Sequence, residues 1–165
     1  MAVKSARRRS REFAVQGLYA WLLSRSSEAD IRKNFADAQG FEKADQAFFS
    51  QLLTGTIESA EELDTLLESA LDRKPGELSP VEHAILLMAA FELKSSTAVP
   101  YRVVINEAVE LAKSYGGTDG HKYVNGVLDK LAKIVRPDGE DAPTAKSRLR
   151  LQAKPKSTPK STQRR

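Results

Sequence analysis

Apolar residues recur at helical spacing along most of the chain, and no segment shows the sustained two-residue alternation of a half-buried strand. The pattern therefore predicts an all-α fold of about six to seven helices. The first helix is expected to run from the arginine-rich start to Leu23, and a short helix is expected over residues 28–39. A longer helical pattern covers residues 43–71, with a change of direction expected near residues 54–56 or at Ser59, where glycine and β-branched residues weaken a helix.

The second half of the chain begins after a turn at Pro75-Gly76. Ser79 is expected to cap the next helix, with Pro80 in its first turn and Glu82 completing a capping box. Residues 84–93 are apolar almost all round, which predicts a central, buried helix.

Two more helices are expected, over residues 100–115 and from residue 118 to Val135, ended by Gly116-Gly117 and by Arg136-Pro137 respectively. Glycines lie inside three of the expected helices, and close helix contact is the expected reason: Gly17, Gly55 and Gly126. The last helix is expected to bury Val124, Val127, Leu128, Leu131 and Ile134.

Charge is distributed unevenly around a net value of +4. Residues 1–11 hold five Lys/Arg and no acid, and residues 142–165 hold eight Lys/Arg and no acid. Residues 12–141 contain the other 13 of the 26 basic residues and all 22 acids, so this segment has a net charge of −9. Basic ends on an acidic body suit nucleic acid without favouring indiscriminate binding over the whole surface. The Lys/Pro/Ser/Thr-rich residues 138–165 lack a packing face and are expected to form a disordered basic tail.

The first helix places Lys4, Arg7, Arg8 and Arg11 on one face at 3.6 residues per turn. Cations oppose the dipole at a helix N-terminus, so the stability of the protein alone gives no reason for the cluster. Binding of an external polyanion would explain the cluster, because guanidinium groups bind phosphate oxygens bidentately. The alternative is an ordinary solvated basic terminus.

Enzyme chemistry has little support in the sequence. There are no cysteines, and the two histidines, His83 and His121, have no metal or nucleophile partner by spacing. Glu107 and Glu110 are interpreted as a solvated helix face. No cofactor is expected. No apolar run is long enough to cross a membrane, and no signal peptide is evident, so a cytoplasmic protein is expected.

The chain resembles the NusB family of transcription antitermination factors. The resemblance is carried by residues 6–16 with their Ala-Arg-Arg-Arg-Ser-Arg-Glu run, Pro80-Val81-Glu82, residues 99–113 and residues 121–130. The last stretch, His-Lys-Tyr-Val-Asn-Gly-Val-Leu-Asp-Lys, is the most specific. The resemblance implies two small helical bundles that share an interface, in one domain over residues 1–137 with subdomains of about 1–74 and 78–137.

The resemblance also implies binding of the boxA element of ribosomal RNA leader transcripts, with the ribosomal protein NusE as partner and with other Nus factors and RNA polymerase joined indirectly. Two alternatives remain open. One is a helical protein-interaction scaffold whose basic ends only aid solubility. The other is an RNA-targeting module of a system that modifies ribosomal RNA, although no methyltransferase domain follows in this chain.

The resemblance implies that Glu82 meets the protein partner and that Tyr123 and Asp119 belong to the RNA-binding surface, together with basic residues and a second tyrosine. Single-stranded bases are read by stacking and by hydrogen bonds to their edges, which calls for cations together with aromatic rings. Each of three residues also has a structural alternative. Tyr123 could belong to the core, Asp119 could be an acid that stabilises the start of a helix, and Glu82 could serve only the capping box. The expected RNA-contacting residues are Lys4, Arg7, Arg8, Arg9, Arg11, Arg73, Tyr115, Asp119, Lys122 and Tyr123.

Overall fold

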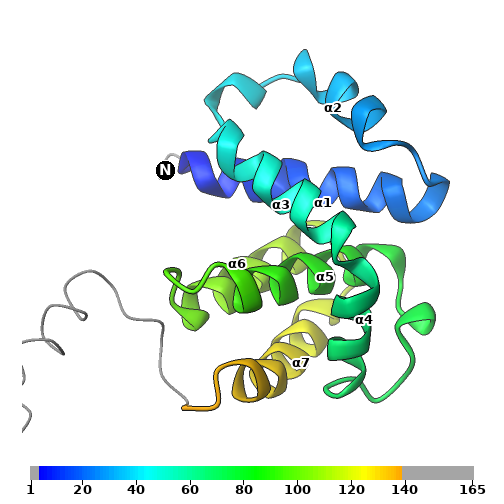
Figure 1. Cartoon of the computed structure of the whole chain (residues 1–165), viewed down its shortest axis with the longest axis vertical. Coiled ribbons are helices and arrows are strands. Elements are labelled where there is room, and N and C mark those ends of the chain that lie inside the picture. The colour runs from blue at the N-terminus through cyan, green and yellow to red at the C-terminus, as the bar shows by residue number, and fades with distance from the viewer. Residues whose placement is uncertain (1–3, 139–165) are drawn as a thin grey trace, which may run out of the picture.

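The computed structural model describes residues 4–138. These residues form seven α-helices and two short 3-10 helices and contain no strand, which confirms the all-α prediction (Figure 1). The expected basic tail from residue 139 onward lies outside the described residues. The elements are α1 (Ala6–Ser24), α2 (Glu28–Ala36), η1 (Phe41–Lys43), α3 (Gln46–Glu58), α4 (Ala60–Glu68), η2 (Pro75–Glu77), α5 (Pro80–Ser95), α6 (Tyr101–Tyr115) and α7 (Gly120–Val135).

Local capping sets several of these boundaries. Ser5 and Ser79 accept hydrogen bonds from backbone N–H groups three residues on, at 3.0 and 3.2 Å, and thereby start α1 and α5. Asp45 caps α3 in the same way through the N–H of Phe48. The expected long helix over residues 43–71 does change direction at Ser59, between α3 and α4.

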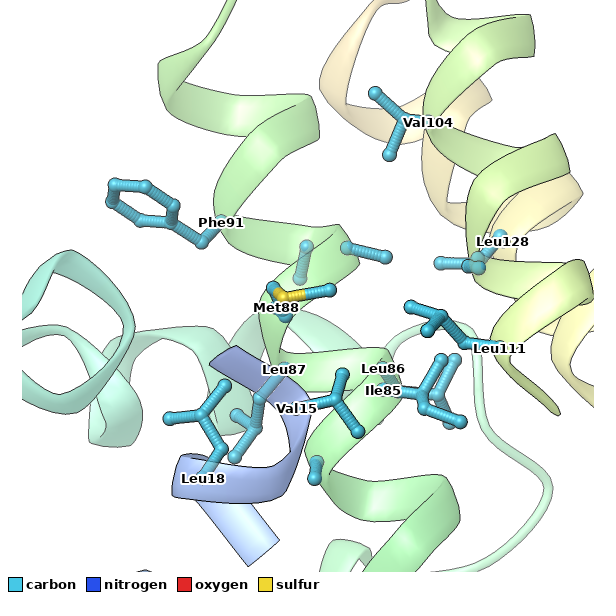
Figure 2. Close-up of a cluster of buried hydrophobic side chains, with 14 of the residues drawn as sticks. Val15, Leu18, Ile85, Leu86, Leu87, Met88, Phe91, Val104, Leu111 and Leu128 are labelled. Carbon is cyan, nitrogen blue, oxygen red and sulfur yellow. The ribbon is translucent and has the colours of Figure 1, made fainter. Parts of the chain in front are cut away.

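Helix α5 is the centre of the molecule, because all ten residues from Ala84 to Leu93 are buried. Helices α1 and α3 pack on one side of it, and α6 and α7 on the other (Figure 1). Figure 2 shows Val15 and Leu18 of α1 reaching one side of α5, while Leu111 and Leu128 approach from the other side. Two small helical bundles therefore share an interface along α5, whereas the subdomain boundary between residues 74 and 78 stays a prediction.

The three interior glycines have different surroundings. A Cβ on Gly17 would lie 2.9 Å from Ile31 Cγ2, and one on Gly55 would lie 2.2 Å from the Phe91 ring, so close packing is confirmed at both. It is wrong for Gly126, whose Cβ would meet nothing within 4 Å. The burial expected for Ile134 is also wrong: it is 47% exposed, since the buried stripe of α7 ends at Leu131 and Ala132.

No helix among residues 4–138 combines the length and the apolar character needed to span a membrane.

Candidate nucleic-acid interface

Long side chains bridge α1 and α6, which run in the same direction, and these side chains form a polar seam. Arg8 of α1 donates from Nε and Nη2 to the Glu107 carboxylate of α6, at 3.1 and 2.7 Å. Two turns further along α1, Gln16 Nε2 donates to the Tyr115 hydroxyl at 3.2 Å. Lys4, just before α1, pairs with Glu12 at 2.8 Å. Three of the expected RNA-contacting residues, Lys4, Arg8 and Tyr115, therefore border one seam.

Arg7 makes only weak contacts within the protein. Its guanidinium lies 4.1 Å from the centroid of the Phe48 ring, and its Nε is 3.8 Å from an oxygen of Asp45, with half of the side chain exposed. Arg9 turns elsewhere, and its Nη1 approaches the backbone at Gly40. Arg7 and Arg8 thus face outward near the start of α1, while Arg9 lies beside the segment between α2 and η1.

Arg11 is placed inside the protein, which contradicts its expected exposure on the basic face. Its side chain is only 5% exposed, and it donates from Nε and Nη2 to both carboxylate oxygens of Glu92, each at 2.8 Å. Glu92 is 2% exposed and belongs to the apolar run of α5. The expectation that stability gives no reason for the cations is therefore wrong for Arg11, because its removal would leave a buried carboxylate unpaired.

An apolar hollow continues the seam beyond Gln16. Its volume is about 440 Å³, and Tyr19, Phe35, Val81 and Tyr115 help to line it. Tyr19 and Tyr115 are 38% and 40% exposed as whole residues, and both are among the exposed large hydrophobic residues of the described chain. Burial raises the pKa of the Tyr115 hydroxyl, and the nearby Glu12 carboxylate raises it further, so this hydroxyl stays protonated at neutral pH.

A second aromatic group lies at the start of α7. The Arg73 guanidinium covers one face of the Tyr123 ring at 4.5 Å from its centroid, and the Tyr123 hydroxyl donates to Asp72 at 3.0 Å. Arg73, followed by Tyr123, lowers the pKa of the Asp72 carboxyl through hydrogen bonds. Nearby, Lys122 Nζ lies 3.5 Å from Asp119, and both side chains are about three-quarters exposed. Tyr123 is partly buried: one part of its side chain packs against the core, and the rest remains accessible from solvent.

Glu82 connects the hollow with the start of α7. It neighbours Val81, and its Oε2 lies 2.9 Å from where a Cβ on Gly120 would be. The Glu82 N–H completes the Ser79 cap, but the return bond from Ser79 N–H to the Glu82 carboxylate is not among the bonds of the described residues. The carboxylate is thus directed toward the N-terminus of α7, where the helix dipole favours it.

Guanidinium groups and partly exposed tyrosine rings thus lie along α1, at the end of α6 and at the start of α7. In the part of the chain that the structure describes, no group of three or more His, Asp or Glu residues is placed to hold a metal ion. The NusB family model matches residues 8–133.

The chain belongs to the NusB family.

Relatives in the NusB family are similar over most of the chain. The transcription antitermination protein NusB of Paraburkholderia phytofirmans is 57% identical over 140 residues, which cover 85% of this chain and 97% of that protein. NusB of Aromatoleum aromaticum is 55% identical over 136 residues, covering 82% and 94%.

Solved NusB structures share the fold. T. maritima NusB superposes with a TM-score of 0.70 at 30% identity, covering 79% of this chain and 93% of that one. A structure of the antitermination factors NusB and NusE in complex with dsRNA superposes with a TM-score of 0.71 at 25% identity, covering 77% and 96%.

Three residues that shape this site are not identified from the sequence. Glu92 is the single acid in the otherwise apolar run of residues 84–93, a pattern that indicates a buried partner for a cation. Glu107 is interpreted there as solvated, whereas it is 15% exposed and bound to Arg8. Tyr19 carries no charge pattern that would single it out, and only the fold brings it beside Tyr115.

Proposed function

We propose that the chain is an RNA-binding transcription antitermination factor that binds the boxA element of ribosomal RNA leader transcripts together with the ribosomal protein NusE. Membership of the NusB family supports this function, as does the similar structure that joins NusB, NusE and dsRNA. The single observation that carries the proposal is the seam that begins at the solvent-reaching Arg8 guanidinium and leads, two turns of α1 further on, to the exposed Tyr115 ring.

Each part of the surface has a role in this proposal. Arg7 and Arg8 bind backbone phosphates, and Lys4 adds positive charge at the same end of α1. Tyr115 offers a ring face for a base, while Tyr123 and the Arg73 guanidinium stacked on it form a second platform. Arg9 and Lys122 contribute positive charge from the edges of this surface. Arg11 contributes indirectly, because its bonds to Glu92 hold α1 against α5.

Glu82 and the adjoining hollow are proposed to receive NusE. The carboxylate suits a cation of the partner, and the apolar lining around Val81 suits an apolar side chain. The protein catalyses no reaction in this function, and it joins the other Nus factors and RNA polymerase indirectly through the assembled complex. Its place of action is the cytoplasm, where bacterial transcription takes place.

The test is a titration of the whole chain with labelled single-stranded RNA carrying a boxA-like sequence and with a scrambled RNA of equal length. The expected result is tighter binding of the boxA-like RNA, with the difference increased by added NusE. Equal and weak binding of both RNAs, unaffected by NusE, would support the scaffold alternative and reject the proposal.

Arg7→Ala is the sharpest variant for the phosphate role, because Arg7 has few internal contacts. It should weaken RNA binding and lower the slope of log K against log salt by about 0.7, the value for one phosphate contact on a single strand. Lys33→Ala, which removes one exposed charge from α2, is the matched control and should leave the slope nearly unchanged.

A further inference from the structure

One exposed arginine of the seam is held in a fixed orientation. Glu107 accepts from Arg8 through both carboxylate oxygens, Oε1 from Nε at 3.1 Å and Oε2 from Nη2 at 2.7 Å. The Glu107 side chain is 15% exposed, whereas that of Arg8 is 39% exposed. The contact thus pairs a largely buried acid with a cation that still reaches solvent.

The bond pattern leaves a defined part of the guanidinium unused. A guanidinium carries five N–H donors in one plane and can bind an oxyanion bidentately through its Nε/Nη edge or through its Nη1/Nη2 edge. Glu107 takes the Nε/Nη2 edge of Arg8. Among the described residues no acceptor is bonded to Nη1 of Arg8, so the Nη1/Nη2 edge keeps a free donor on each nitrogen for a second oxyanion.

The carboxylate is itself anchored from the interior. Arg11 Nη1 lies 3.9 Å from Glu107 Oε1, and Arg11 is bound on its other edge by the buried Glu92. Glu92, Arg11, Glu107 and Arg8 therefore alternate in charge from the core to the surface. The hydrogen bond from Arg8 to Glu107 and the charge of that carboxylate raise the pKa of Arg8, which keeps the guanidinium fully charged.

An acid on a phosphate-binding surface needs a reason, because its charge repels RNA. We propose that Glu107 is a positioning residue for RNA binding, which fixes Arg8 so that its Nη1/Nη2 edge faces an RNA phosphate. The inference rests on the proposed function and assigns a role in it to a residue that contacts no RNA itself. Preorganisation of Arg8 outweighs the repulsion, since the side chain no longer has to be ordered on binding.

Glu110 provides a matched control on the same helix. It lies close enough to raise the pKa of Arg8 by its charge, but it pairs with Lys113 at 3.4 Å rather than with Arg8. Glu107→Gln and Glu110→Gln therefore remove the same charge from the same neighbourhood, and only the first removes the carboxylate that orients Arg8. A positioning role and a simple charge effect predict opposite signs for Glu107→Gln.

The experiment titrates the whole chain and its variants with a boxA-like single-stranded RNA at two salt concentrations, after circular dichroism has shown each variant folded at the assay temperature. Glu110→Gln should strengthen binding, more so at low salt. Glu107→Gln should weaken RNA binding by about threefold to tenfold, which corresponds to the net contribution of about one hydrogen bond. In an Arg8→Ala background, Glu107→Gln should cause no further loss, since the two residues act as one unit.

The outcomes separate the inference from the proposed function. If Arg8→Ala weakens binding while Glu107→Gln strengthens it as Glu110→Gln does, the positioning role is rejected and the phosphate role of Arg8 stands. A loss from Glu107→Gln that persists in the Arg8→Ala background also rejects the positioning role. If Arg8→Ala leaves RNA affinity unchanged, the phosphate role of Arg8 itself is rejected.

Discussion

Two arginines one turn apart on α1 have different roles, because different acids reach them. Arg11 meets the buried Glu92, and Arg8 meets the less buried Glu107. The sequence identifies the basic face, but it cannot pair residues that are 81 and 99 positions apart. The distinction between a structural and an RNA-facing arginine therefore requires the fold.

Arg11→Ala should lower the free energy of unfolding by about 3–5 kcal/mol, because it leaves Glu92 charged, buried and unpaired. Urea denaturation measures the change. The double variant Arg11→Met with Glu92→Leu removes both charges and should recover most of the stability. An equal loss in the single and double variants would show that packing, not the ion pair, is responsible.

Tyr123 combines packing and exposure, so its variants should separate the ring from the hydroxyl. Tyr123→Phe keeps the ring under Arg73 and should bind RNA nearly as well as the parent chain. Tyr123→Ala should lose about 1–3 kcal/mol of RNA binding, the range for removing a stacking platform. RNA titration beside chemical denaturation distinguishes this loss from unfolding. Unchanged RNA affinity in Tyr123→Ala would remove this platform from the interface.

Asp119 is an exposed acid paired with Lys122 at 3.5 Å. Asp119→Asn removes a negative charge from the turn before α7, one helical turn from Tyr123, and releases Lys122, so RNA binding should strengthen, and more at low salt. Titrations at two salt concentrations measure the effect. Asp138→Asn, at the end of the described chain, is the control for a general charge effect and should change RNA affinity less.

At the scale of helices, the sequence predicts boundaries well where capping is local. Ser79 with Pro80 marks the start of α5, and the break at Ser59 follows from the weak helix formers before it. The extent of the buried face is predicted less well, because it depends on which neighbour covers each turn. Ile134 has helical spacing with Leu131 yet is 47% exposed, whereas the next residue, Val135, packs against the core.

Glycines in α3 and α7 provide a matched pair of substitutions. Gly55→Ala would place a Cβ 2.2 Å from the Phe91 ring and should cost about 1–3 kcal/mol by overpacking. Gly126→Ala meets open space and should stabilise the protein by up to about 1 kcal/mol through helix propensity. Urea denaturation of the two variants should shift the midpoint in opposite directions. Destabilisation by Gly126→Ala would contradict the open environment.

At the scale of the whole molecule, positive charge is concentrated at the two ends of the chain. Residues 142–165 carry eight Lys/Arg and no acid. Deleting them should leave the unfolding midpoint unchanged, because they offer no apolar face at helical or strand spacing for packing. Binding of scrambled RNA at low salt should weaken more than selective binding of boxA-like RNA. Loss of selectivity on deletion would make residues 142–165 part of the specific interface.

The order in which the chain is synthesised gives the pairing of Arg11 with Glu92 another consequence. A nascent chain emerges from its N-terminus, so α1 is available long before the residue that neutralises Arg11 has been added. Until α5 emerges, α1 can pack against α2 and α3 but keeps a cation on the side that α5 will cover. The arrival of the central helix, rather than the completion of the first three, is therefore the stage of synthesis at which α1 reaches its final environment.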